Sequence, residues 1–589
     1  MPSTSRLARL GTWCFDRRRS VLAAWIATLA FAFVVLAPLA GTFQADFRTP
    51  GSDSTAADRV LQARFPDRSS STIDVVWHSA SGAQSPQVRT QIDRLLAEAA
   101  ALRGIGDTTP PEISRDGKTA VARLQIDAER DSDVPTRTGE RLVSLARGAS
   151  GDGLQVAMSG WAISNAEGSE VSPEFVGFAI AAVVLLLTFG SLLAAGLPLL
   201  TALFGLGIGT TLVGTLAAIT DVPDFATAVA GMMAIGVGID YALLVITRFR
   251  GALAAGLAPR DAVAEATATA GRSVLVAGLT VVIALLGLFA MRLPFLNGVA
   301  ISASLAVLIA VCAAVTLLPA LLGFAGRRID ALRVPGSRAR VGNGRPSRWV
   351  AYSHAIQRRP WSATLAGTLI IVVLAIPVTN FRLGFPDDGN NPKQTMTRQA
   401  YDLIVSGFGP GASGPLLITA ELPRGAGSEG RRDLALLRDR IAAQPGVVSV
   451  SPPQLDRSAS AAILMAIPST SPQDAATQRL VDRLRDDVVP ALSGPTGLSV
   501  HVGGMTAYVV DQSEYTLARL PLFIGAVVSL SFLLLLAAFR SLPVAVKAGV
   551  MNLLSIGRPT ASSRSSPRAA GPGSSSGSTR RRRCRRSSR

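Results

Sequence analysis

The chain has 589 residues, of which 48% are hydrophobic and 17% are charged, and its formal net charge is +18. The apolar residues are gathered into long uncharged runs, which excludes an ordinary soluble protein and is typical of a polytopic membrane protein. The basic excess does not call for a nucleic-acid partner, since ten arginines lie in residues 558–589 and basic residues commonly flank membrane spans.

Eight complete membrane spans are predicted, each long enough as a helix to cross a hydrocarbon core of roughly 30 Å. They are expected at about 21–40, 174–193, 197–220, 225–247, 273–291, 298–325, 361–380 and 519–538. The first span is not a cleavable signal, because its apolar core is long and no small-residue cleavage pattern follows it. Pro259–Gly271 is expected to be a short amphipathic helix on the membrane surface.

The distribution of arginine predicts how the spans are oriented. Arg17, Arg18 and Arg19 precede the first span, which places residues 1–40 with their N-terminus in the cytoplasm of a multi-pass plasma-membrane protein. Alternation of the spans then places the arginine-rich linker 326–360 on the cytoplasmic side as well.

Two long polar segments, 41–173 and 381–518, are expected outside the membrane and are predicted to be α+β domains. The first has strand-like runs at 72–77, 119–126 and 154–158, with helix patterns between them. The second repeats this order, with strands at 415–420, 447–450, 461–467 and 498–502 and helices at 431–443 and 473–489. The order favours split-βαβ, porter-like domains.

The two halves of the sequence match in register, which indicates a parallel tandem duplication. The matched positions, at offsets of 343 to 350, are Phe65 with Phe408, Gly160 with Gly504, Glu167 with Asp511, Glu170 with Glu514, and Phe189 with Phe539. Of these, the acids could line a substrate entrance, but solvated helix termini are the favoured interpretation.

The second half of the repeat is incomplete in this sequence. The first half has a five-span bundle at 174–325, whereas the second has 361–380 and then 519–557, in which the ninth span breaks off. Residues 558–589 are mostly arginine, serine, proline, glycine and alanine, so they are expected to be a disordered basic tail. Because the change of composition interrupts a span, a frameshift product is favoured over a lipid-binding tail, and the tenth to twelfth spans are expected to be missing.

Asp240 is a carboxylate within the otherwise uncharged span 225–247. An acid at this depth costs about 2.5–3.5 kcal/mol, and such residues commonly mark ion pathways. Gly236 lies one turn earlier on the same helix face, where water or another helix can approach. Tyr241 adds a hydroxyl group that can donate or accept a proton. The sequence therefore predicts a proton-titrating site; the alternative is a structural acid paired with a neighbouring helix.

Small residues recur at every fourth position of the same span and form a stripe suited to close helix packing. They are Ala226, Ala230, Ala234, Gly238 and Ala242.

Neither enzymatic chemistry, a cofactor nor a metal is predicted. The sequence has no Walker A motif, and Gly409–Gly414 matches G-x-G-x-x-G only between a helix and a strand, which is the wrong context. The cysteines and histidines are too scattered to suggest disulfides or ligand sets, and the histidines are interpreted as surface residues. These residues are Cys14, Cys312, Cys584, His78, His354 and His501.

The layout and one motif resemble a known family. One span, a large outer segment and five spans, then the same again, is the plan of the resistance–nodulation–division (RND) superfamily. Gly236-Val237-Gly238-Ile239-Asp240-Tyr241, followed by Arg248-Phe249-Arg250, is similar to the fourth-span motif of its MmpL branch (mycobacterial membrane protein large). Residues 266–280 are also similar to that branch, and the resemblance covers about residues 10–557.

The resemblance implies an RND-type repeat in which proton flow drives export of lipids or other hydrophobic molecules through the outer domains. Asp240 and Tyr241 match the proton-relay pair, and Gly236 and Gly238 are expected to pack around it. The family's second pair lies in a tenth span that this sequence lacks, so this chain by itself is expected to be inactive. The expected partners are the hydrophobic substrate, protons, membrane lipids, and further copies or accessory envelope proteins.

Two other functions stay open. A protein-secretion accessory subunit of the same superfamily would share the layout, although the Asp-Tyr pair and the basic loop after it favour the lipid-exporter branch. A scaffold or receptor that transports nothing would not need Asp240 to titrate.

Overall fold

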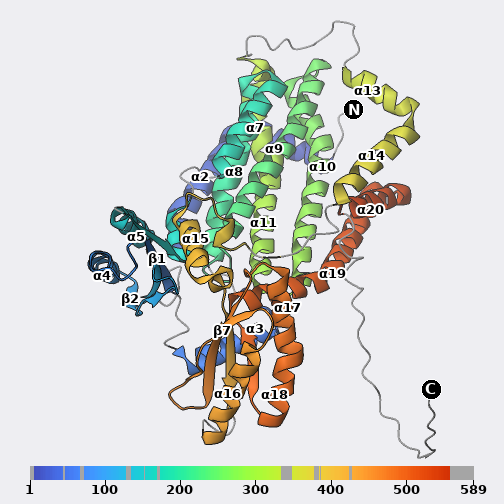
Figure 1. Ribbon diagram of the computed structural model, residues 1–589. Helices are drawn as coiled ribbons and strands as arrows, with labels where there is room; N and C mark the ends of the chain where they lie inside the picture. The colour runs from blue at the N-terminus through green and yellow to red at the C-terminus, as the bar shows by residue number, and fades with distance from the viewer. Residues whose placement is uncertain are drawn as a thin grey trace, which may run out of the picture. The chain divides into compact units, whose positions relative to one another are not determined.

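The computed structural model describes residues 5–43, 47–66, 72–127, 134–151, 153–168, 173–332, 348–376, 384, 386–422 and 427–556 (Figure 1). Within these residues the chain forms two compact units. The larger lies within Met1–Arg345 and Leu383–Gly549, and the smaller contains α13 (Arg348–Arg358), α14 (Pro360–Ala375) and the end of α20 (Leu542–Ile556). The predicted basic tail, Glu170 and Cys584 lie outside the described residues.

Six helices or helical runs among the described residues are long and apolar enough to cross a membrane. They are α2 (Arg18–Phe31) with its continuation to Leu39, α8 (Leu192–Leu216), α9 (Phe225–Ala254), α10 (Pro259–Leu286), the run of α11 (Pro294–Cys312) and α12 (Leu318–Ala325), and α19 (Met505–Phe539). These coincide with six predicted spans. The predicted spans 174–193 and 361–380 correspond to shorter apolar helices, α7 (Pro173–Phe189) and α14. The expectation of a helical, polytopic membrane protein is therefore confirmed.

Small residues let the bundle helices approach closely. The predicted stripe on α9, from Ala226 to Ala242, is buried along its whole length. A Cβ atom added at Gly238 would lie 3.4 Å from the Cα of Ala202 in α8 and 3.8 Å from the Cβ of Ala310 in α11. Figure 1 shows α8, α9 and α11 side by side. Because lipid provides no hydrophobic force between helices, close packing of this kind holds the bundle together.

One predicted element is wrong, and one predicted span starts too late. Pro259–Gly271 is not a separate surface helix but the beginning of the continuous helix α10. Its apolar face is buried because α1 (Arg6–Asp16), a helix that was not predicted, packs on it, with Gly11 against Thr267. The span expected at 519–538 is likewise the end of a longer helix, since α19 begins at Met505.

The two polar segments each contain one antiparallel sheet with the same strand order. The first sheet has the order β2-β4-β1-β5, with β3 beside β4, and the second has β7-β9-β6-β10, with β8 beside β9. The strands are β1 (Thr72–Ser79), β2 (Ile105–Thr108), β3 (Glu112–Ile113), β4 (Thr119–Ile126), β5 (Leu154–Ser159), β6 (Leu416–Glu421), β7 (Val447–Val450), β8 (Gln454–Leu455), β9 (Ala461–Pro468) and β10 (Ser499–Gly503). The identical order in both halves is what a tandem duplication produces.

Two helices cross over from one strand to the next in each sheet, which gives the split-βαβ order. In the first segment they are α4 (Pro86–Ala100) and α5 (Thr136–Ala149). In the second they are α16 (Ser428–Ala442) and the run of α17 (Ala475–Arg483), η11 (Leu484–Val488) and α18 (Val489–Thr496). The apolar cores of the sheets include Ile73, Leu124 and Met158 in the first and Ile418 and Leu464 in the second.

A further pair of helices is exchanged between the halves. Helix α3 (Asp53–Arg64) precedes the first sheet in sequence, yet Val60 and Phe65 pack on Ala461 and Ile463 of the second sheet. Helix α15 (Met396–Phe408) precedes the second sheet, yet its residues Met396, Ala400 and Leu403 belong to the core of the first. Figure 1 shows α3, in blue, beside the orange elements of the second sheet. Each α+β domain is therefore completed by a helix from the other half.

Candidate functional site

The predicted membrane site lies on α9. This helix begins at Phe225, whose backbone N–H donates a hydrogen bond to the carboxylate of Asp224 at 2.7 Å. The buried stripe fixes the rotation of this helix against α8 and α11. The opposite face is open: Met232, Gly236, Asp240 and Leu244, four residues apart, are all exposed. Asp240 therefore points away from the packed bundle.

The structure places the four predicted site residues on different faces of α9. Asp240 has no hydrogen bond or ion pair among the described residues, and no described atom lies within 4 Å of a Cβ added at Gly236. Tyr241 is buried instead, and its ring lies 3.5 Å from a Cβ added at Gly278 of α10. Gly238 lies at the contact with α8 and α11. Asp240 and Gly236 thus share an uncovered face, while Tyr241 and Gly238 are inside the bundle.

The matched acids outside the bundle are not solvated helix termini, as the sequence had suggested. The side chains of Glu167 and Asp511 are only 8% and 7% exposed. Each one accepts hydrogen bonds from the first backbone N–H groups of the exchanged helix that comes from the other half. These two carboxylates are not solvated because the exchanged helices cover them. Glu514 is exposed, but it lies within the long helix α19 and not at a helix terminus.

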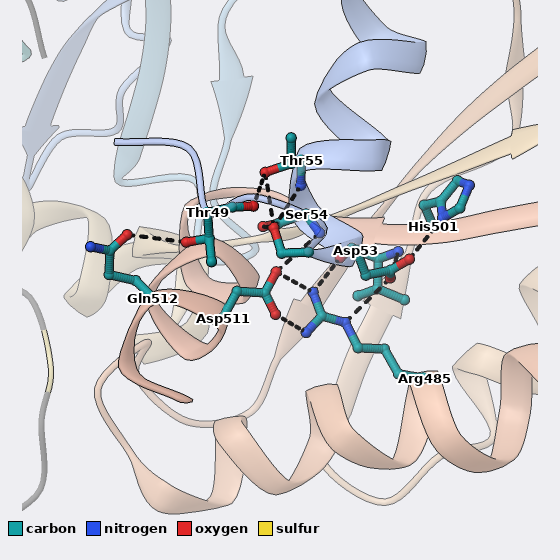
Figure 2. A network of polar contacts seen from close by, with 10 residues as sticks. Thr49, Asp53, Ser54, Thr55, Arg485, His501, Asp511 and Gln512 are labelled. Carbon is teal, nitrogen blue, oxygen red and sulfur yellow. Dashed lines mark hydrogen bonds and ion pairs between the residues drawn. The ribbon is translucent and has the colours of Figure 1, made fainter. Parts of the chain in front are cut away.

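Figure 2 shows the network around Asp511, which we call the Asp511 clamp: Asp53, Arg485, His501 and Asp511. The Oδ2 atom of Asp511 accepts a hydrogen bond from the backbone N–H of Ser54 at 3.0 Å. The guanidinium of Arg485 donates to both carboxylate oxygens of Asp511, with Nη2 3.0 Å from Oδ2, and its Nε lies 3.3 Å from Oδ2 of Asp53. One arginine of the second half therefore bridges an acid of each half.

Asp53 adds a second attachment of α3 to strand β10. Its Oδ2 accepts a hydrogen bond from the backbone N–H of Val502 at 2.7 Å, and its Oδ1 lies 2.7 Å from Nδ1 of His501. Burial alone would raise the pKa of Asp53, but the bonds from His501 and Val502 and the charge of Arg485 outweigh it and lower the pKa. Asp53 is therefore held in its charged form, which is the form that the clamp requires.

The first half has an equivalent arrangement, the Glu167 clamp, made of Arg147, Glu167 and the first residues of α15. Both carboxylate oxygens of Glu167 accept from the backbone N–H of Met396 at 2.8 Å, and one accepts from Thr397 at 3.3 Å. Arg147 lies 3.7 Å from Glu167. A carboxylate at a helix N-terminus satisfies free N–H groups and opposes the positive end of the helix dipole.

The remaining residues singled out in the sequence do not form a ligand set. Cys14 is buried and Cys312 exposed, and no cluster of potential metal ligands occurs among the described residues. His78 contacts Thr119 at 3.0 Å, and His354 is exposed. His501, interpreted as a surface residue, belongs to the Asp511 clamp instead. The sequence around His501 offered no sign of this, because its partner Asp53 lies 448 positions away in the chain.

A bundle of membrane-length helices with an acid on one of them, together with two α+β domains that exchange helices, defines a polytopic membrane protein of the transporter class. The chain belongs to the MMPL family, whose sequence profile matches residues 46–363 and 432–557. The predicted MmpL-type identity is therefore confirmed, and the match ends where the composition of the sequence changes.

Three relatives show how closely the chain resembles other proteins. It is 33% identical to the membrane protein YdfJ of Bacillus subtilis, over 92% of this chain and 75% of YdfJ. It is 29% identical to the mycolic acid-containing lipids exporter MmpL11 of Mycolicibacterium smegmatis, over 93% of this chain and 59% of that protein. It is 30% identical to the heme uptake protein MmpL11 of Mycobacterium tuberculosis, over 91% of this chain and 57% of that protein. The chain thus spans less than two thirds of the MmpL11 proteins that it matches.

Proposed function

We propose that this chain takes part in proton-driven transport of lipids or other hydrophobic molecules across the plasma membrane, with Asp240 as the group that titrates. The observation that carries the proposal is the position of Asp240, on the uncovered face of a helix whose other face is fixed by close packing. A carboxylate in this position can take up a proton from water or from a facing helix without disturbing the bundle.

Tyr241 is proposed as the second member of the relay. Tyr241 follows Asp240 directly and is buried against α10. A change in the charge of Asp240 can therefore affect the contact between α9 and α10. Gly236 keeps the face of Asp240 accessible, and Gly238 keeps α9 close to α8 and α11. These four roles are proposals that mutagenesis can separate.

The substrate class rests on the relatives. One MmpL11 protein is named as an exporter of mycolic acid-containing lipids and another as a heme uptake protein, and both cargoes are large and hydrophobic. We propose export as the direction for this chain, with an N-terminus in the cytoplasm. The arginines that support this orientation gather at one end of the bundle, where Arg250 pairs with Asp330 at 2.6 Å and Arg260 with Asp16 at 2.8 Å.

The test is the variant Asp240→Asn, which is nearly isosteric but cannot ionise. The chain, completed with the spans that the second half of the repeat is expected to lack, is reconstituted in liposomes with and without the substitution. Two quantities are measured: the infrared carboxyl band as a function of pH, and the movement of a fluorescent lipid analogue under a proton gradient. We expect the variant to lose a titrating carboxyl band and to abolish gradient-dependent movement. The control is Asp221→Asn, at an exposed acid near the start of the same helix.

The two readouts distinguish the alternatives. A scaffold or receptor would show no gradient-dependent lipid movement in either protein. A structural acid would leave the carboxyl band and the transport of the Asn variant unchanged, and that result would refute the relay.

A further inference from the structure

Helix α1 carries a row of basic and aromatic side chains along one face. Arg6, Arg9 and Trp13 are three or four residues apart, which places them along one side of the helix, and Arg17 follows directly after its last residue. All four are exposed. The guanidinium of Arg17 lies over the ring of Trp13, 5.6 Å from its centroid. We call these four residues the α1 stripe.

The opposite face of α1 is fully used by the protein. Ala8, Gly11 and Cys14 are buried there. A Cβ added at Gly11 would lie 2.5 Å from Oγ1 of Thr267, so α1 and α10 are in close contact at this point. The carboxylate of Asp16 accepts three hydrogen bonds from Arg260 of α10, at 2.8, 2.9 and 3.2 Å. Helix α1 is therefore held in place by protein contacts, and it does not need lipid to bury its apolar side.

The structure separates the arginines of this region by what they contact. Arg18 turns inward, donates a hydrogen bond to the carbonyl of Gly323 at 2.9 Å and lies over the rings of Phe15 and Phe324. Arg260 is neutralised by Asp16. Arg6, Arg9 and Arg17, in contrast, form no ion pair with any residue that the structure describes. Three positive charges on one helix face are thus left without an acid.

The place of α1 in the chain shows what these charges face. Only Arg17 separates α1 from α2, the first apolar run of membrane length, so the helix must lie at the membrane–water boundary. Guanidinium groups bind phosphate oxygens in bidentate fashion, and tryptophan favours the headgroup level of a bilayer. We propose that the α1 stripe is a binding site for the headgroup of an anionic phospholipid. This proposal does not depend on the transport activity.

The site can be tested with the purified full chain in detergent. Phosphatidylglycerol is titrated in, with phosphatidylcholine as the neutral reference, and bound lipids are counted by native mass spectrometry. Each arginine near a charged lipid surface contributes about a fivefold gain in affinity, so Arg6→Gln, Arg9→Gln and Arg17→Gln together should weaken the first bound phosphatidylglycerol strongly. Phosphatidylcholine binding should not change, and raising the salt concentration should reduce the difference.

A matched control uses three other exposed arginines from the same end of the bundle, Arg248, Arg272 and Arg327. Their replacement by Gln should leave the first phosphatidylglycerol bound nearly as tightly as in the wild-type chain. Equal losses in both triple variants, or no loss in the α1 variant, would overturn the proposal, because the basic surface would then act without a defined site. Replacement of the three stripe arginines by Lys guards against misfolding, since it keeps the charge and should retain most of the preference for phosphatidylglycerol.

Discussion

Removing the Arg485 side-chain charge should release the exchanged helix α3 from the second sheet. Arg485 and Asp511 are 15% and 7% exposed, and the Nε of Arg485 also lies 3.3 Å from Asp53. In Arg485→Met the apolar stem is kept, but two carboxylates are left close together without a cation. Breaking a buried ion pair in this way costs about 3–5 kcal/mol. Because Asp53 is 31% exposed, we expect the lower end of that range.

The effect should be local, so amide hydrogen exchange is the appropriate assay. A loss of about 3 kcal/mol corresponds to a rise of roughly a hundredfold in the opening of α3. Peptides that cover Asp53–Arg64 should therefore exchange roughly a hundredfold faster in the variant, while peptides from the first sheet keep their rates. Arg89→Met is the control, because Arg89 and Asp93 are 77% and 69% exposed at 3.9 Å and contribute at most about 0.5 kcal/mol.

The reasoning would be refuted if α3 exchanged at the wild-type rate in Arg485→Met, or if Arg89→Met accelerated it equally. Either result would mean that apolar contacts of Val60 and Phe65 alone hold the helix. Asp511→Asn gives an independent check. It keeps an oxygen for the N–H of Ser54 and loses only the charge, so its effect should be smaller than that of Arg485→Met.

Three further outcomes are expected. The pKa of Asp53 is lowered in the folded chain, so its contribution to stability is complete above the unfolded pKa of about 3.9 and is lost as the pH falls through the folded pKa. The protection of α3 from amide hydrogen exchange should therefore stay constant from neutral pH to about pH 5 and fall in stronger acid. Asp53→Asn should remove that pH dependence. Gly238→Leu should destabilise the bundle by about 1–3 kcal/mol in thermal unfolding, because its Cβ would already contact Ala202, whereas Gly236→Leu should be tolerated. Burial opposes it, but hydrogen bonds from Ser458, Ala461 and Ser460 lower the pKa of Asp456 to about 2. Asp456→Ala should therefore lower the free energy of unfolding of the second domain, measured by denaturant titration, by about 2–3 kcal/mol at neutral pH but much less below pH 2.

Much of the fold could be predicted because its signals are local in the sequence. Apolar runs located the spans, and alternating residues located β1, β4, β6 and β9 within one or two residues of their observed ends. The match between Phe65 and Phe408 even marked the ends of α3 and α15, although the helices themselves were not recognised. The stripe of small residues on α9 was also read correctly, since spacing alone puts those residues on one face.

The roles of the matched acids could not be predicted in the same way. Glu167 and Asp511 were recognised as equivalent, but nothing near them in sequence shows that a helix from the other half covers them. The N–H of Ser54 and the carboxylate of Asp511 are 457 positions apart, and Met396 and Glu167 are 229 apart. A carboxylate beside an open helix end and one beside an exchanged helix have the same local sequence.

The sequence by itself thus determined which segments are apolar enough for the membrane, which alternate as strands, and where the chain repeats, because hydropathy and periodicity are properties of consecutive residues. Only the tertiary structure decided which sheet each helix completes, that α1 covers the start of α10, and that Asp240 lies on an open face while Tyr241 is buried. These features depend on which distant surfaces meet, and burial changes the charge and the partners of a side chain without changing its neighbours in the chain.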